Sequence, residues 1–134
     1  MEIQRRNSKQ RSKMRELLCG RTDHPDAQTI YEEIREIFPS ISLGTVYRNL
    51  MLLTEENELQ SINVGDGKIH FDPNIKPHAH FYCKVCHRVL DFNTADEMNA
   101  VLDKQQQAFG GKIDECSISF KGICADCMAA DLKN

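Results

Sequence analysis

The fold of the second half of this chain is decided by the stretch HAHFYCKVCHRVLDF, residues 78–92. Its two arms, residues 80–85 and 88–92, alternate apolar and polar side chains as paired strands do. Cys83 and Cys86 lie where the chain reverses direction between the arms. The pattern therefore predicts a pair of strands with two thiols at the turn.

A second Cys-x-x-Cys pair, Cys124 and Cys127, follows near the end of the chain. Two intervening residues let both sulfurs of such a pair reach one ion, so the two pairs together predict a closed tetrahedral Zn(II) site. Residues 83–87 also match the c-type haem attachment pattern, and a single Cys-x-x-Cys pair is typical of thiol redox enzymes. Neither alternative explains the second pair. Cys19 and Cys116 belong to no pair, and we assign them no role.

Between the two cysteine pairs, the sequence predicts a helix and a further strand. Thr94 begins a capping-box sequence, Thr-Ala-Asp-Glu, and Gly110 ends the apolar periodicity that follows it. Residues 113–120 have the composition of a strand that leads into the second pair. The predicted apolar face of the helix consists of Met98, Val101, Leu102 and Phe109. This small α/β unit offers strand edge and helix face to a second copy of itself, which predicts a two-fold homodimer.

Charge is distributed unevenly along the chain. The first 21 residues carry seven Lys and Arg against two Glu, a charge of +5, while the whole chain has a net charge of -3. A basic segment attracts anions such as the phosphates of DNA, although by itself it is more often a solvated helix face. The sequence contains no secretory signal and no apolar run of membrane-spanning length. We therefore expect a cytoplasmic protein without membrane contact, in which the cysteines stay reduced and available to metal.

The first half of the chain predicts three helices followed by a hairpin. The predicted helices are residues 9–18, 27–38 and 43–53. Asp26 and Ser42 precede the second and third helices as N-caps. Two strand-like runs, 59–64 and 68–71, flank an Asp-Gly turn at Asp66. Three helices and a hairpin in this order are typical of a winged-helix DNA-binding domain.

In a winged helix, the third helix enters the major groove and cationic side chains elsewhere bind phosphates. The candidate DNA-contacting residues are Arg11, Ser42, Thr45, Tyr47 and Arg48. The alternative is a domain that contacts proteins, in which Tyr47 packs against its neighbours.

Two prolines within residues 73–77 interrupt both strand and helix, so we place the domain boundary there. The predicted fold class is therefore α+β. A winged-helix DNA-binding domain (residues 1–72) and a linker (73–77) precede a small α/β dimerisation domain with a four-cysteine zinc site (78–134).

Several motifs together resemble the ferric uptake regulator (Fur) family over residues 10–127. They are His24-Pro25, the run SLGTVYRNL at residues 42–50, Gly65-Asp66-Gly67, His78-Ala79-His80 with the first cysteine pair, and GICADC at residues 122–127. The resemblance implies a homodimeric repressor, without enzymatic turnover, that binds a palindromic double-stranded DNA operator. DNA binding in this family requires a regulatory divalent metal held between the two domains.

The resemblance places the regulatory ligands at His24, Asp72, His78, His80 and Asp91. Three imidazoles and two carboxylates form a mixed nitrogen and oxygen shell, which suits Fe(II) or Mn(II). His78 and His80 are two residues apart, so on an extended segment both rings face the same side. Because the ligands come from both halves of the chain, metal binding would tie the halves together.

The carboxylates distinguish two branches of the family. Iron-sensing members typically have glutamate where Asp91 stands, whereas the peroxide-sensing branch (PerR) resembles this chain in having aspartate at both carboxylate positions. We therefore expect a peroxide sensor in which Fe(II) reacts with hydrogen peroxide and a ligand histidine, His24 or His78, is oxidised. An iron-responsive Fur-type repressor is the alternative, and a zinc-structured thiol redox protein is a remote one. His70, close to Asp72 in sequence, is expected at the surface.

Overall fold

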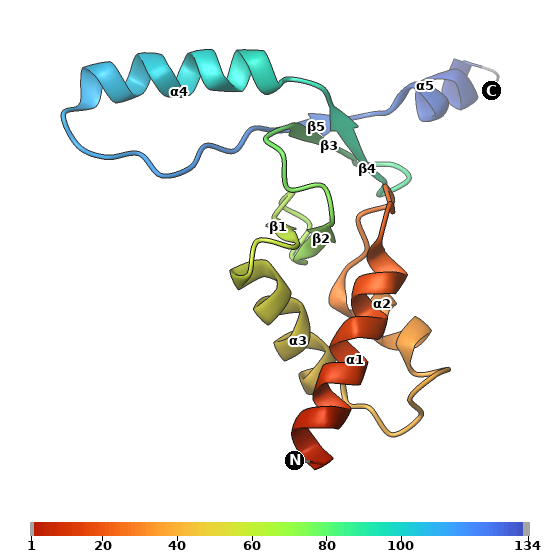
Figure 1. Cartoon of the computed structure of the whole chain (residues 1–134). Coiled ribbons are helices and arrows are strands. Elements are labelled where there is room, and N and C mark those ends of the chain that lie inside the picture. Colours follow the sequence, from red (N-terminus) through yellow and green to blue (C-terminus); the bar gives the residue numbers. More distant parts are fainter. Residues whose placement is uncertain (1, 133–134) are drawn as a thin grey trace. The chain divides into compact units, whose positions relative to one another are not determined.

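The computed structural model describes residues 2–132 and combines helices with two small sheets (Figure 1). The chain divides into two compact units, Met1–Ile75 and Lys76–Asn134, and this division falls within residues 73–77. The first unit contains α1 (Glu2–Leu18), α2 (Ala27–Ile34), α3 (Leu43–Glu55), β1 (Gln60–Ile62) and β2 (His70–Asp72). The second contains β3 (Ala79–Cys83), β4 (Val89–Phe92), α4 (Ala95–Phe109), β5 (Ser119–Gly122) and α5 (Ala125–Leu132). The predicted α+β class is confirmed.

Two helices of the first unit, α2 and α3, begin where capping side chains satisfy free backbone N–H groups. The side chain of Asp26 accepts a hydrogen bond from the N–H of Thr29 at 2.9 Å, and Ser42 accepts one from the N–H of Thr45 at 3.1 Å. The predicted start of α1 at residue 9 was wrong, because the helix already includes the preceding residues. Apart from Ile3 these residues are polar and show no apolar stripe, but Arg, Gln and Glu have high intrinsic helix propensity.

The second helix ends four residues earlier than predicted. Its last residue is Ile34, and a turn follows in which the N–H of Ile37 donates to the carbonyl of Ile34 at 3.0 Å. Ile37 is consequently exposed, although its spacing placed it on the buried stripe. The residues before Pro39 leave the helix because a proline disfavours helical geometry in its neighbour.

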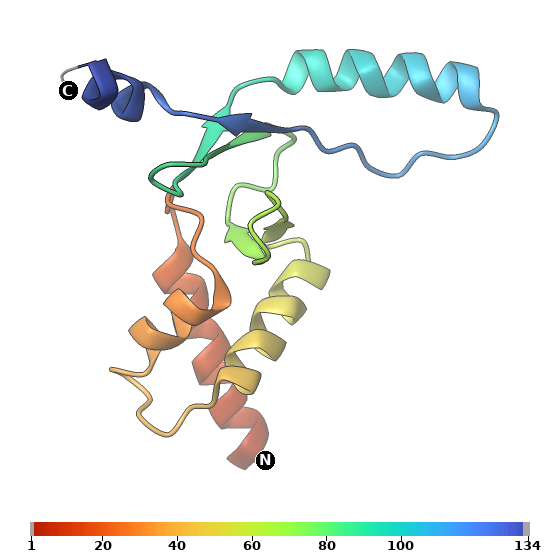
Figure 2. The ribbon, with the colours of Figure 1, turned by 180° about the vertical axis from the view of Figure 1, so that it is seen from behind.

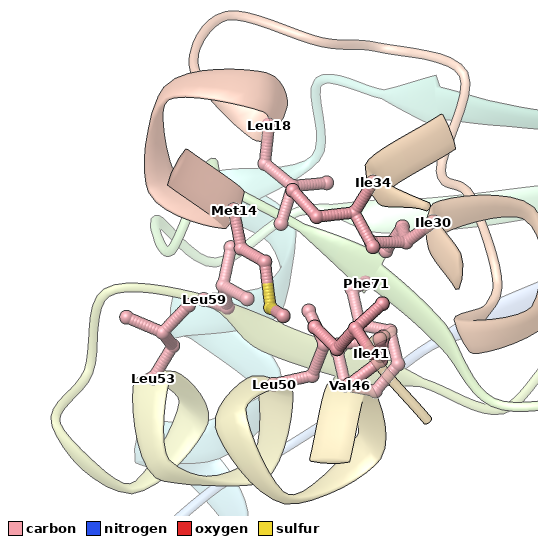
Figure 3. Packing of buried hydrophobic residues seen from close by; sticks show 10 residues of the cluster. All are labelled: Met14, Leu18, Ile30, Ile34, Ile41, Val46, Leu50, Leu53, Leu59 and Phe71. Carbon is pink, nitrogen blue, oxygen red and sulfur yellow. The ribbon is translucent and has the colours of Figure 1, made fainter. Parts of the chain in front are cut away.

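A single apolar cluster holds the three helices and the hairpin together (Figure 3). It consists of Met14, Leu18, Ile30, Ile34, Ile41, Val46, Leu50, Leu53, Leu59 and Phe71. Phe71 is the contribution of β2 and is completely buried. The backbone N–H of Phe71 also donates to the carbonyl of Pro25 at 2.9 Å, which fixes the hairpin against the start of α2. A Phe71→Ala substitution would cost about 3–5 kcal/mol of unfolding free energy.

The wing is a short antiparallel hairpin. Gln60 pairs with Asp72, and Ile62 pairs with His70. Both strands are shorter than predicted, and residues 63–69 form the loop between them. Gly65 and Gly67 in this loop have φ values of 85° and 81°, in the left-handed region that glycine adopts without strain.

The second unit is built around a three-stranded sheet with the order β4-β3-β5. β3 and β4 are antiparallel and joined by the first cysteine pair, whereas β3 and β5 are parallel and α4 lies in the connection between β4 and β5. Pairing of β3 with β5 begins opposite Ser119. The predicted strand over residues 113–118 was therefore wrong, since these residues lie before that point. Both views of the ribbon show this segment returning from the end of α4 toward the sheet (Figure 2).

The capping box predicted at Thr94 was also wrong. The Thr94 side chain makes no hydrogen bond that caps α4, and instead its Oγ1 accepts one from the N–H of Ala79 at 2.9 Å. Met98 is buried on the helix, while Val101 and Phe109 are exposed. Gly110 ends the helix with a φ of 79°. Among the residues that the structure describes, no helix has the length and apolar character needed to cross a membrane.

Candidate functional site

The two cysteine pairs meet in one cluster of the second unit. The Sγ atoms of Cys83 and Cys127 are 3.8 Å apart, and those of Cys86 and Cys124 are also 3.8 Å apart. Tetrahedral zinc with Zn–S bonds of about 2.3 Å requires sulfurs about 3.8 Å from one another, whereas a disulfide requires about 2.05 Å. The end of β3, the turn after it and the start of α5 thus supply a donor set that fits zinc.

The electrostatics of the cluster also fit a dication. Hydrogen bonds from the backbone N–H groups of Cys86 and Cys124 lower the pKa of Cys83 to about 5, against the effect of burial. The interaction with the Cys124 sulfur, together with burial, raises the pKa of Cys127 to about 12. Four sulfurs this close therefore do not all ionise by themselves. A bound divalent cation removes the repulsion and lets every sulfur act as a thiolate.

Arg88 contacts this cluster and was missed in the sequence analysis. Its Nε lies 3.3 Å from the sulfur of Cys86, and its Nη2 lies 3.3 Å from that of Cys124 and 2.9 Å from a carboxylate oxygen of Asp126. Hydrogen bonds to these three partners raise the pKa of Arg88 above its ordinary value. The signal available in the sequence was a cationic residue two positions after the first cysteine pair.

Two of the residues predicted as regulatory ligands, His24 and Asp72, lie in the first unit. His24 Nε2 and Asp72 Oδ2 are 3.2 Å apart, and both side chains are almost inaccessible to solvent. Asp72 ends β2, and its other carboxylate oxygen accepts a hydrogen bond from the N–H of Asn74 at 2.9 Å. His24 has a φ of 52°, an uncommon value for a residue with a side chain and one that indicates local strain.

His70 supports the strained backbone of His24. Its Nδ1 is 2.6 Å from the His24 carbonyl oxygen, and its Nε2 is 2.7 Å from a carboxylate oxygen of Asp66. A carbonyl oxygen can only accept, so Nδ1 is the donor in the hydrogen bond to His24. Burial raises the pKa of Asp66, but hydrogen bonds from His70 and from the N–H of Lys68 outweigh this effect and lower it. The expectation of a surface histidine was wrong, because His70 is buried.

The other three residues predicted as regulatory ligands, His78, His80 and Asp91, lie in the second unit. Oδ1 of Asp91 is 2.9 Å from His78 Nε2 and 3.3 Å from His80 Nε2. His80 and Asp91 face each other across the β3–β4 pairing. The Nδ1 atom of His78 lies 2.6 Å from the carbonyl oxygen of Lys76, which orients the ring with Nε2 toward Asp91. Octahedral bonds of about 2.1 Å place adjacent donors about 3.0 Å apart, so the three atoms suit a shared cation.

The outer face of α3 carries the residues predicted to contact DNA. Tyr47 and Arg48 are exposed, and the hydroxyl of Thr45 lies between Ser42 Oγ at 2.9 Å and Arg48 Nη2 at 3.2 Å. Arg11 has a different environment, since its Nε donates to the side chain of the buried Asn49 at 3.1 Å. Arg11 therefore joins α1 to α3, whatever contact it makes with DNA.

Comparison with known proteins agrees with these features. A model of the ferric uptake regulator family matches residues 2–121. The peroxide operon regulator of Bacillus subtilis is 29% identical over 118 residues, covering 88% of this chain and 81% of that protein. The crystal structure of the Campylobacter jejuni peroxide stress regulator has a TM-score of 0.79 at 26% identity and covers 94% of each chain. A zinc uptake regulator solved with zinc and DNA shares the fold, with a TM-score of 0.74 at 21% identity over 92% of this chain and 83% of that one.

Proposed function

Because the chain belongs to the ferric uptake regulator family, we propose that it is a homodimeric, metal-dependent DNA-binding repressor that senses peroxide. Its cofactors are a structural Zn(II) and a regulatory Fe(II) or Mn(II). The observation that carries this proposal is the presence of two incomplete donor sets, one in each unit of the chain. Similarity to peroxide regulators of Bacillus subtilis and Campylobacter jejuni supports the choice of signal.

One regulatory ion takes ligands from both sets. His24 and Asp72 offer two donors, too few for an ion that prefers five or six. His78, His80 and Asp91 offer three more. The combined set of three imidazoles and two carboxylates balances the charge of a divalent ion. It also excludes thiolates, which would favour copper(I) or zinc.

The metal acts by differential affinity. The two units can be arranged so that all five donors reach one ion, or so that only two or three do. The ion has the higher affinity for the arrangement that supplies all five donors. It therefore shifts the population toward that arrangement. We infer that this arrangement is the one in which the dimer binds its operator, so that loss of the metal releases DNA.

The first unit reads the DNA. The helix α3 presents Tyr47 and Arg48 to solvent, and Ser42 caps its start. Arg5, Lys9 and other exposed cations of α1 provide positive charge for phosphates. In the winged-helix mode, α3 enters the major groove while the basic residues set its register on the backbone.

The second unit forms the dimer. Several large apolar side chains are exposed on its strands and on α4, and a monomer rarely leaves so many uncovered. They include Phe92, Val101, Phe109, Phe120 and Ile123. Covering them with a second copy would create a two-fold axis and present two α3 helices to the half-sites of a palindromic operator.

Peroxide acts on the protein at the regulatory metal site. Bound Fe(II) would activate hydrogen peroxide, and in the net reaction a ligand imidazole would supply two electrons, take up one oxygen atom and leave one water molecule. We place the oxidation at His24 or His78, whose Nε2 atoms lie 3.2 Å and 2.9 Å from the carboxylate oxygens of Asp72 and Asp91. An imidazole that gains one oxygen atom is a poorer ligand, so the ion leaves and DNA is released.

The test uses the full chain loaded anaerobically with Fe(II) or with Mn(II), and a DNA duplex selected from a randomised pool against the Mn(II) form. Stoichiometric hydrogen peroxide is added, DNA binding is measured, and peptide mass spectrometry follows. We expect a gain of one oxygen on His24 or His78 and loss of DNA binding with iron, and neither change with manganese.

Two results would change the assignment. An iron-loaded protein that stays unmodified and still holds DNA would identify an iron-responsive repressor instead. If neither metal promotes DNA binding, the proposal that the protein is a metal-dependent repressor is refuted. Wherever the protein binds DNA through phosphate contacts, we expect its affinity for DNA to fall as the salt concentration rises.

A further inference from the structure

The guanidinium group of Arg88 bridges the two cysteine pairs. One nitrogen contacts Cys86 of the first pair and another contacts Cys124 of the second, both at 3.3 Å. The second nitrogen is also held by Asp126, which lies between the two cysteines of the second pair, at 2.9 Å. The side chain is thus fixed at three points although half of it is exposed to solvent.

The four sulfurs do not have the same protection. Cys83 is buried and receives hydrogen bonds from the backbone N–H groups of Cys86 and Cys124 at 3.5 and 3.4 Å. Cys86, in contrast, is exposed. Arg88 donates both to the exposed sulfur of Cys86 and to that of the buried Cys124, so its side chain covers the one sulfur of this pair that the fold leaves open to solvent.

A zinc ion with four thiolates carries a net charge of about -2, and its sulfurs remain nucleophilic. A cation that donates N–H groups to two of them draws electron density from the sulfurs and offsets part of the charge. We propose that Arg88 shields the thiolates of Cys86 and Cys124 from oxidation by peroxide and so keeps zinc bound while the regulatory site reacts. The inference rests on the proposed function for its setting, because a peroxide sensor has to keep its zinc while it meets peroxide.

The reaction that Arg88 opposes consumes two ligands. Hydrogen peroxide accepts two electrons from two thiolates and, with two protons, becomes two water molecules. The two sulfurs form a disulfide, which is no longer an anionic ligand, and the zinc ion is released. The first step is attack by a thiolate sulfur on peroxide oxygen, and a sulfur that accepts a charged hydrogen bond is the weaker nucleophile.

The experiment compares the parent with Arg88→Gln, Arg88→Lys and Lys84→Gln, all purified with zinc and without a regulatory metal. Lys84 is an exposed cation on the same turn, so its substitution removes the same charge without touching a sulfur contact that the structure shows. Zinc release by hydrogen peroxide is followed with a chromogenic chelator. Mass spectrometry of each cysteine peptide at early times shows which sulfur is oxidised first.

We expect Arg88→Gln to release zinc about five- to tenfold faster than the parent, with oxidation appearing first at Cys86 and Cys124. Arg88→Lys should fall between the two, and Lys84→Gln should match the parent. Unchanged release in Arg88→Gln would overturn the proposal. So would equal acceleration at all four cysteines, because a loosened fold exposes every sulfur.

Two further measurements keep the outcome clear. If Arg88→Gln does not retain zinc on purification, Asp126→Asn removes only the anchor of the guanidinium and should give a smaller acceleration at the same two cysteines. Its failure to do so would also count against the proposal. Oxidation of His24 or His78 in iron-loaded protein is scored separately, so an error in the proposed function is distinguished from an error about Arg88.

Discussion

His70 donates a hydrogen bond from Nδ1 to the backbone carbonyl of His24, with 2.6 Å between the two atoms. His24 precedes a proline and has a positive φ, a combination that an isolated chain would avoid. The contact joins β2 to the start of α2 and holds the imidazole of His24 beside Asp72. A side chain outside the proposed ligand set thus fixes the direction of one that belongs to it.

Replacing His70 should weaken regulatory metal binding. We expect His70→Gln to lower the affinity for Mn(II) about tenfold, the usual effect of losing a group that orients a ligand. The affinity is measured from the electron paramagnetic resonance signal of free Mn(II). Lys68→Ala, a change at an exposed residue of the same hairpin, serves as the control. Equal affinities for His70→Gln and the parent would refute this role.

Removal of the zinc site should unfold the second unit alone. Structural zinc contributes about 10–16 kcal/mol in small domains, more than a unit with so few buried residues can replace. We expect Cys124→Ser to purify without zinc and as a monomer. The helices of the first unit should persist in circular dichroism, because their apolar core contains no residue of the second unit. Retention of a dimer without zinc would contradict the expectation.

Substitutions on α3 should separate phosphate contacts from base contacts. If Arg48 binds phosphate, Arg48→Ala weakens binding to all duplexes similarly and reduces the salt dependence by about one ion. If Tyr47 contacts bases, Tyr47→Ala weakens binding to the selected duplex by about 1–3 kcal/mol and leaves the salt dependence unchanged. Fluorescence anisotropy at several salt concentrations measures both quantities. Parent-like binding by both variants would exclude this helix face from the interface.

Acid should remove the contribution of the Asp26 cap. Burial raises the pKa of Asp26, but hydrogen bonds from Thr29 lower it below the ordinary value of 3.8 in the folded chain. A lowered folded pKa means that the stabilisation is complete above this ordinary value and is lost as pH falls through the folded pKa. We expect Asp26→Asn, which keeps a capping oxygen, to show a flatter loss of stability below about pH 4. Urea unfolding at pH 2.5 to 6 measures this, and parallel curves would contradict it.

Much of the fold follows from local signals in the sequence. Asp26 and Ser42 cap the helices for which they were predicted, because a side-chain oxygen before an apolar periodic run has a nearby donor to accept. The cysteine spacing predicts a cluster because two residues between thiols fix their reach. Signals of this kind are short-range, so they do not depend on the rest of the structure.

The misses have the opposite character. Thr94 satisfies a donor in β3 rather than its own helix, and His70 bonds a residue 46 positions earlier in the chain. Arg88 likewise spans 36 positions to reach Cys124. Partners this distant leave no periodic trace in the sequence. Val101 and Phe109, which were predicted on the apolar face of α4, are exposed in the single chain, whereas Met98 on the same predicted face is buried.

The central claim is that one ion takes ligands from both units, and metal binding by two matched variants tests it most directly. Asp72→Asn alters the donor set of the first unit and Asp91→Asn that of the second, while both keep the size of the side chain. We predict that the parent binds one tight Mn(II) per chain, and that each variant loses this same ion and DNA binding with it. If Mn(II) stays tightly bound in either variant, the two sets do not share an ion and the account is contradicted.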